Sequence, residues 1–172
     1  GCGRISTMVI KYLSGFNFKV VGVDPYLPIE VAKANGIELL KTREELAEVS
    51  DIVISHIPVI KSEEDKVDKK FFYATKKSPI FINMARGASV NYDDLTEALK
   101  NGHIRWAGLD VVDTEPADFN KEIFELSNVT FSPHAAFYSE TALVECRSQS
   151  AQNILNYMSG DKENVYYVVK PE

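Results

Sequence analysis

The chain has 172 residues, which is enough for one domain with a full core and too few for two ordinary domains. Its 19 Lys and Arg residues against 25 Asp and Glu residues give a net charge of -6, which argues against direct binding of nucleic acid. The two cysteines have no CxxC spacing and the three histidines are scattered, which predicts no metal site and fits a cytoplasmic protein. No apolar run approaches the roughly 20 residues that span a bilayer, which predicts no membrane partner.

The apolar residues switch repeatedly between a helical and a strand period along the chain. A helical stripe over residues 8–16 is followed by the short apolar run 18–24, which ends in an acid and predicts a buried parallel strand. Further strands are predicted at 36–40, 51–58, 79–84, 105–111 and 128–133. Further helices are predicted at 28–36, 42–49, 67–75, 92–101 and about 139–158.

Strands that alternate with helices predict an α/β fold, a Rossmann-type doubly wound parallel sheet with helices on both faces. In such a sheet, ligands bind beyond the carboxyl ends of the strands, so the residues that follow each strand are the candidates for function. The sequence opens on the glycine loop GCGRIS, and a loop of this kind follows a strand. The sheet is therefore expected to lack its first strand.

The opening loop has the features of a dinucleotide-binding turn. Gly1 and Gly3 would allow a tight turn and a close approach of the backbone to a pyrophosphate at a helix N-terminus. Ser6 replaces a third glycine, and Asp24 ends the next strand at a spacing where an acid meets the ribose hydroxyls. Since no arginine follows Asp24 to receive a 2′-phosphate, the pattern predicts NAD rather than NADP. The alternative is that the glycines and the acid serve only a turn.

Three more predicted strands end in reactive residues. INMARG presents Arg86, LDVVDTEP presents Asp110 and Glu115, and FSPHAAFYSE presents His134. With the glycine loop, this set resembles the NAD-binding domain of the D-2-hydroxyacid dehydrogenases over essentially the whole chain, because the motifs occur in the order that the family has. The stretch PHAAFYSE resembles the C-terminal-binding-protein branch of that family most.

The resemblance implies a proton donor, a partner for it and a substrate anchor. A histidine titrates near neutrality and suits proton donation to an alkoxide, the role that falls to His134. Glu115 is its expected carboxylate partner, with Asp113 as a competing candidate, and Arg86 offers a planar fork that matches a substrate carboxylate. For His134 alone, capping of a turn is the competing interpretation.

The resemblance also implies a wider set of cofactor contacts. Backbone amides at the glycine loop would hold the pyrophosphate, Asp24 the ribose, the segment after residue 55 the adenine or ribose side, and three further strand ends the nicotinamide. The cofactor-binding residues expected on this ground are Gly1, Gly3, Arg4, Ile5, Asp24, His56, Ile57, Pro58, Met84, Ala85, Arg86, Asp110, His134 and Ala136.

At the level of the whole protein, the resemblance implies a homodimer that interconverts a small 2-hydroxy acid and its 2-oxo acid. Residues 1–160 are expected to form the NAD-binding domain and residues 161–172 a tail that returns to a substrate domain. The piece alone is expected to be inactive or nearly so. Two alternatives stay open: an NAD(H)-sensing protein that dimerises or recruits partners, and, less consistent with the Arg, Glu and His set, a methyltransferase.

Two hydrophobic residues are expected to serve packing only. Trp106, in a predicted strand, is assigned to the core, and Cys146, on the last predicted helix, is expected to be buried and inert.

Overall fold

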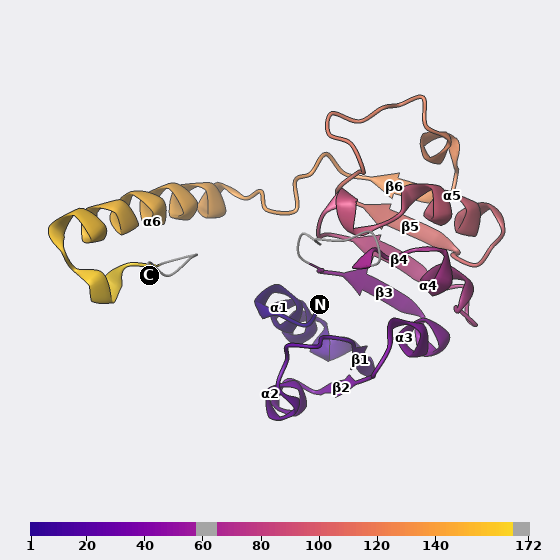
Figure 1. Cartoon of the computed structure of the whole chain (residues 1–172), viewed down its shortest axis with the longest axis horizontal. Coiled ribbons are helices and arrows are strands. Elements are labelled where there is room, and N and C mark those ends of the chain that lie inside the picture. The colour runs from indigo at the N-terminus through magenta and orange to yellow at the C-terminus, as the bar shows by residue number, and fades with distance from the viewer. Residues whose placement is uncertain (58–64, 167–172) are drawn as a thin grey trace. The chain divides into compact units, whose positions relative to one another are not determined.

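The computed structural model of the chain describes residues 1–57 and 65–166 (Figure 1). Its contacts divide it into two units, Gly1–His134 and Ala135–Glu172. The first unit holds the strands, and the second consists mainly of one long helix. The prediction of a single domain over residues 1–160 stays a prediction.

The N-terminal part of the first unit is a two-stranded parallel sheet with two helices. Its elements are α1 (Arg4–Leu13), a 3-10 turn η1 (Ser14–Phe16), β1 (Val20–Gly22), α2 (Ile29–Ala34) and β2 (Ile37–Leu39). A small core of Cys2, Ala32 and Ile37 lies between them, with Ile10 packed against it. This packing holds the start of α1 beside the end of β1, where a dinucleotide loop belongs.

The rest of the first unit is a four-stranded parallel sheet in the order β3-β4-β5-β6. Its elements are α3 (Arg43–Val49), β3 (Ile52–Ser55), α4 (Lys69–Tyr73), β4 (Ile80–Asn83), η3 (Gly87–Ser89), α5 (Tyr92–Lys100), β5 (Trp106–Leu109), η4 (Glu122–Glu125) and β6 (Val129–Phe131). The helices α3, α4 and α5 lie beside this sheet (Figure 1). They bury apolar side chains against it, and Phe72, Phe81 and Leu95 are fully enclosed. Along β3, β4 and β5, buried residues alternate with more exposed ones, because successive side chains of a strand point to opposite faces of the sheet.

Side-chain caps set the first residue of each helix on this face. The Thr42 hydroxyl accepts a hydrogen bond from the Glu45 amide, the Asp68 carboxylate accepts from the Lys70 amide, and Asn91 accepts from the amides of Asp93 and Asp94. Each cap satisfies backbone donors that the first turn of a helix leaves without a partner. The capping residues in the sequence thus fix where α3, α4 and α5 begin.

The second unit contains α6 (Glu140–Ser159) and a short turn η5 (Lys162–Asn164). The Ser139 hydroxyl caps α6 by accepting from the Ala142 amide, and Gly160 ends it in the left-handed conformation, with φ of 81°. No described helix of the chain is long and apolar enough to cross a membrane.

The predicted helices and strands are confirmed, and most are shorter than predicted. The first and last helices are shifted instead: α1 covers Arg4–Leu13 against the predicted 8–16, and α6 covers Glu140–Ser159 against about 139–158. Sequence reasoning missed the 3-10 turns, which have no periodic apolar signal. Trp106 is not a core residue: 42% of it is exposed, because its neighbour Ala107 points into the core and Trp106 takes the opposite face of β5. Cys146 is exposed in the second unit, not buried.

Candidate active site at the strand ends

The predicted functional residues lie at one edge of the four-stranded sheet. Because β3 to β6 are parallel neighbours, His56, Arg86, Asp110 and His134 follow their strands at the same carboxyl edge. In the described chain, none of the paired strands links β1 to β3. Gly1 lies next to the strand ends of both sheets: its nitrogen donates to the Val23 carbonyl after β1 at 3.0 Å, and its Cα faces the His56 backbone after β3.

The imidazole of His134 is paired with Glu115. Its Nδ1 lies 2.8 Å from Glu115 Oε2, and both side chains are about two-fifths exposed. A carboxylate at Nδ1 fixes the ring orientation and leaves Nε2 as the atom that can meet a substrate. His134 has a left-handed backbone, with φ of 52°. This conformation turns the chain sharply after β6.

The competing carboxylate, Asp113, has another partner. Its Oδ2 is ion-paired with the Lys121 ammonium, and its Oδ1 accepts a hydrogen bond from the Thr114 amide. The preference for Glu115 over Asp113 therefore agrees with the geometry. Both residues lie on the segment between β5 and η4, two positions apart.

Arg86 sits on a tight turn between β4 and η3. Its side chain is exposed, and Nη1 donates to the Ala85 carbonyl at 2.7 Å. Gly87 directly follows, and a Cβ added to it would lie 1.7 Å from the Val112 carbonyl oxygen. The Arg86 turn thus packs backbone against backbone with the segment that leads to Glu115.

Asp110 is buried at the end of β5, with 3% of its surface exposed. Its Oδ1 accepts a hydrogen bond from the Ser132 hydroxyl at 2.5 Å, and the Ser132 carbonyl in turn accepts from the His134 amide at 3.0 Å. The Asp110 amide donates to the Asn83 carbonyl. These bonds join the ends of β4, β5 and β6 into one connected edge.

The glycine loop is organised by Asp24. Its Oδ2 accepts from the Cys2 amide at 2.8 Å and its Oδ1 from the Tyr26 amide at 2.9 Å. Partial burial opposes ionisation of Asp24, but these backbone donors outweigh it and lower the pKa of the carboxyl below 3.8. The ionised group therefore stabilises the fold above its ordinary pKa, and that contribution is lost as the pH falls through the lowered value.

The loop leaves room where a pyrophosphate would lie. A Cβ added to Gly3, the N-cap of α1, would meet nothing within 4 Å, whereas one added to Gly1 would lie 2.8 Å from the His56 carbonyl oxygen. Ser6 is buried and its hydroxyl donates to the Gly1 carbonyl at 2.6 Å, so it substitutes for a third glycine. The first amides of α1 have no partner within a helix and point toward this space.

Two polar atoms beside this loop lack partners. Within the described residues, Ser55 Oγ and His56 Nε2 are buried and have no hydrogen-bond partner. Burial also lowers the pKa of the His56 imidazole, which favours its neutral form. Unpaired buried polar atoms are costly unless a ligand or solvent meets them. A dinucleotide bound beside the glycine loop fits this requirement.

Five other predicted cofactor residues fall into four groups. Met84 and Ala85 lie on the Arg86 turn, Met84 exposed and Ala85 buried, and Ile57 packs partly buried against the main core. Ala136 belongs to the second unit, so its place near the site stays a prediction. Pro58 lies outside the described residues.

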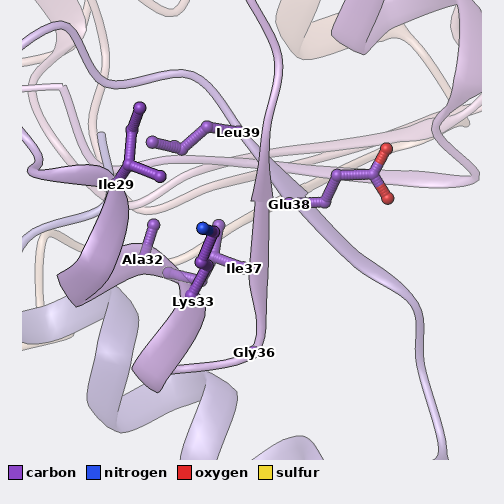
Figure 2. Close-up of a pocket in the computed structure, with 7 residues that line it drawn as sticks. All are labelled: Ile29, Ala32, Lys33, Gly36, Ile37, Glu38 and Leu39. Atoms are coloured by element: carbon purple, nitrogen blue, oxygen red, sulfur yellow. The ribbon is translucent and has the colours of Figure 1, made fainter.

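Two other site types have little support in the described part of the chain. No group of three or more His, Cys, Asp and Glu side chains there could hold a metal ion. A hollow of about 470 Å³ lies between α2 and β2, and its walls are mostly aliphatic (Figure 2). It contains none of the predicted site residues, so we place no chemistry in it.

Sequence reasoning missed three polar residues that hydrogen-bond to the predicted site residues. Asn83, Ser89 and Ser132 bind the backbone or side chains of the predicted residues, and Asn83 and Ser89 are fully buried. Polar residues inside or beside a strand are the one signal that could have found them, because such residues need partners when buried.

Comparison with known proteins agrees with this geometry. Residues 1–136 match the family model of the D-isomer specific 2-hydroxyacid dehydrogenase, NAD binding domain. The chain is 35% identical over 166 residues to D-3-phosphoglycerate dehydrogenase of Methanocaldococcus jannaschii. The aligned region covers 96% of this chain and 32% of that relative.

Solved structures give the same result. The apo form of Rhodotorula graminis D-mandelate dehydrogenase is 33% identical, with a TM-score of 0.82 over 91% of this chain and 46% of its own. The D-lactate dehydrogenase of Aquifex aeolicus, crystallised with NAD and lactic acid, is 28% identical, with a TM-score of 0.84 over 100% of this chain and 56% of its own.

The match defines the family and leaves its branches open. The chain spans about a third to a half of the length of the relatives it matches. These relatives are named as dehydrogenases, and the likeness to the C-terminal-binding-protein branch stays a prediction. The matched residues include the glycine loop, Asp24, Arg86, Glu115 and His134. The chain therefore belongs to the D-isomer specific 2-hydroxyacid dehydrogenases, as their NAD-binding domain.

Proposed function

We propose that the natural polypeptide carrying this chain is an NAD-dependent oxidoreductase that interconverts a D-2-hydroxy acid and its 2-oxo acid. The observation that supports this most is the Glu115–His134 pair, which lies at the same strand-end edge as Arg86 in a chain of this family. A proton donor and a carboxylate anchor are the two groups that reduction of a 2-oxo acid requires of the protein.

His134 acts as the proton donor to the carbonyl oxygen of the substrate. Glu115 holds Nδ1 of the ring, so the proton leaves from Nε2. In the direction of oxidation, the neutral ring takes the hydroxyl proton back at the same atom.

Arg86 binds and orients the substrate. Its guanidinium can form two parallel hydrogen bonds with the substrate carboxylate and can polarise the neighbouring carbonyl. Bound NAD would supply or accept the hydride. Asp110 would hold the carboxamide side of its nicotinamide ring, and Met84 and Ala136 would line that ring.

The other half of the cofactor lies on the glycine loop. Gly1, Gly3, Arg4 and Ile5 place backbone amides on the pyrophosphate, and the support for this is the open space before α1. Asp24 accepts hydrogen bonds from the ribose hydroxyls. The segment of His56, Ile57 and Pro58 lines the adenine or ribose side, where the unpaired His56 Nε2 gains a partner.

We further propose a cytoplasmic homodimer that does not bind nucleic acid, on the family resemblance and the net charge of -6. Sedimentation equilibrium at micromolar concentration should give twice the mass of one chain, and a monomer mass would contradict the dimer. The NAD(H)-sensing alternative has less support, because the relatives carry the names of dehydrogenases.

The experiment that tests the function follows the loss of NADH absorbance. Purified natural polypeptide is incubated with pyruvate, glyoxylate, hydroxypyruvate, 3-phosphohydroxypyruvate and phenylglyoxylate in turn. Reduction of at least one acid is expected, and chiral chromatography of a chiral product should show the D-hydroxy acid. Tight NADH binding without reduction of any acid would overturn the dehydrogenase proposal in favour of the sensor.

Replacing Asp24 with serine is expected to weaken NADH binding by about 10-fold, because a charged acceptor for the ribose hydroxyls is lost. NADPH should lose less or gain, since the carboxylate that repels its 2′-phosphate is gone. Nicotinamide fluorescence titrations measure both constants. The matched control is Glu38→Ser, which removes an acid from β2 of the same small sheet and should leave the ratio of the two constants unchanged.

A further inference from the structure

The turn that presents Arg86 is held by one buried amide. We propose that Asn83 is a positioning residue, which fixes the backbone of Arg86 so that the guanidinium meets the substrate carboxylate; this inference rests on the proposed function. Asn83 is the last residue of β4 and is fully buried. Its side chain therefore lies inside the protein, against the backbone of the turn, and is not exposed to solvent.

Both ends of the Asn83 amide bind the turn. The Oδ1 atom accepts from the Ala85 amide at 3.1 Å, and Nδ2 donates to the Arg86 carbonyl at 3.1 Å. One side chain thereby closes a ring around residues 83 to 86. A residue of the same size without both a donor and an acceptor could not make this pair of bonds.

The Arg86 carbonyl also accepts from the far side of the turn. The fully buried Ser89 donates to it twice, from its hydroxyl at 2.7 Å and from its amide at 3.1 Å. With Asn83 Nδ2, three donors therefore converge on one carbonyl oxygen. The backbone of Arg86 is fixed from β4 on one side and from η3 on the other.

Backbone fixation matters because the Arg86 side chain is exposed. Within the described residues, its guanidinium donates to the adjacent Ala85 carbonyl, which is part of the same turn. Two-point recognition of a carboxylate needs the guanidinium plane within a narrow range of positions, and displacement of about 1 Å can cost as much as 100-fold in rate. The turn must supply that precision.

Asn83 also links this turn to the rest of the site. Its carbonyl accepts from the amide of Asp110, whose carboxylate binds the Ser132 hydroxyl two residues before His134. One connected set of hydrogen bonds therefore fixes the position of Arg86 relative to His134. A shift at Asn83 would change the distance between the two groups.

The test compares Asn83→Asp with wild type in the natural polypeptide. Aspartate keeps the size and the acceptor but loses the Nδ2 donor and sets a carboxylate oxygen against the Arg86 carbonyl. For the acid that wild type reduces fastest, KM is expected to rise about 10-fold or more, with a smaller fall in kcat. The dissociation constant of NADH should stay within about 2-fold, since the lost bond faces the substrate anchor.

A gentler variant and a matched control guard against simple unfolding. Ser89→Ala removes one of the three donors and should raise KM about 3-fold, in the same direction. Ser50→Ala removes another hydroxyl of a buried serine, whose bond to the Leu46 carbonyl is 2.7 Å long, at the end of α3. It should lower the unfolding midpoint as Ser89→Ala does and leave KM unchanged.

The outcomes separate the two proposals. If wild type reduces none of the acids, the proposed function and this inference both fail. If wild type is active but Asn83→Asp and Ser89→Ala keep its KM, Asn83 has no positioning role and the function stands. If both variants lose NADH affinity in proportion to KM, their effect is general and the inference also fails. A selective rise in KM supports it.

Discussion

Replacing His134 with alanine is expected to lower kcat for reduction of a 2-oxo acid by about 10²- to 10⁴-fold, the usual contribution of a positioned general acid. The hydride can still be transferred, but the alkoxide that forms must then take its proton from water. The affinity for NADH should change little, because the His134 ring is bound to Glu115 rather than to the glycine loop. Stopped-flow single turnovers of enzyme with bound NADH measure the chemical step directly.

The matched control is His103→Ala. His103 stacks on Tyr73 with 4.1 Å between ring centroids, before β5 at the opposite end of the strands from His134. Its loss should leave kcat unchanged. Glu115→Gln should give an intermediate fall in kcat, since the amide can still orient the ring but the hydrogen bond loses its charged partner. Equal rates for wild type and His134→Ala would remove His134 from the mechanism.

The sequence predicts the sheet and its functional edge well because both depend on local patterns. Short apolar runs mark the strands, and the residue types that follow them mark the edge, so Arg86, Asp110 and His134 could be placed together without coordinates. The spacing of the glycine loop and Asp24 carries similar local information. The structure adds that Asp24 binds the Cys2 amide directly, which spacing alone does not contain.

What the sequence could not predict depends on contacts between distant segments. The sequence favours Glu115 over Asp113 only through the family resemblance, and it does not contain the ion pair between Asp113 and Lys121, eight residues further on. Trp106 was assigned to the core by its size, but the pleat of β5 places it on the more exposed face, where its indole donates to the Thr130 hydroxyl. The sequence also gives no signal for the role of Asn83, because its hydrogen bonds to Ala85 and Arg86 depend on the folded turn.

Gly87 gives the second large effect. Replacing it with alanine is expected to lower the free energy of unfolding by about 3 kcal/mol or more, at the upper end of what an added methyl group costs in a packed site. The added Cβ would lie 1.7 Å from the Val112 oxygen and 2.2 Å from its carbonyl carbon. Both atoms are backbone, so no side chain can rotate away, and the Arg86 turn must separate from the segment that leads to Glu115.

Urea unfolding followed by circular dichroism measures the change, with Gly108→Ala as the matched control. Gly108 lies in β5, and a Cβ there would meet only the Ile82 side chain, at 3.8 and 4.0 Å. This second substitution should therefore change stability by less than about 1 kcal/mol. In the fraction of Gly87→Ala protein that stays folded, kcat/KM should also fall, because Arg86 and the Glu115–His134 pair no longer keep their spacing. Equal stability of the two variants would mean that the turn tolerates a side chain at Gly87, and the close backbone contact would then have no part in holding the site.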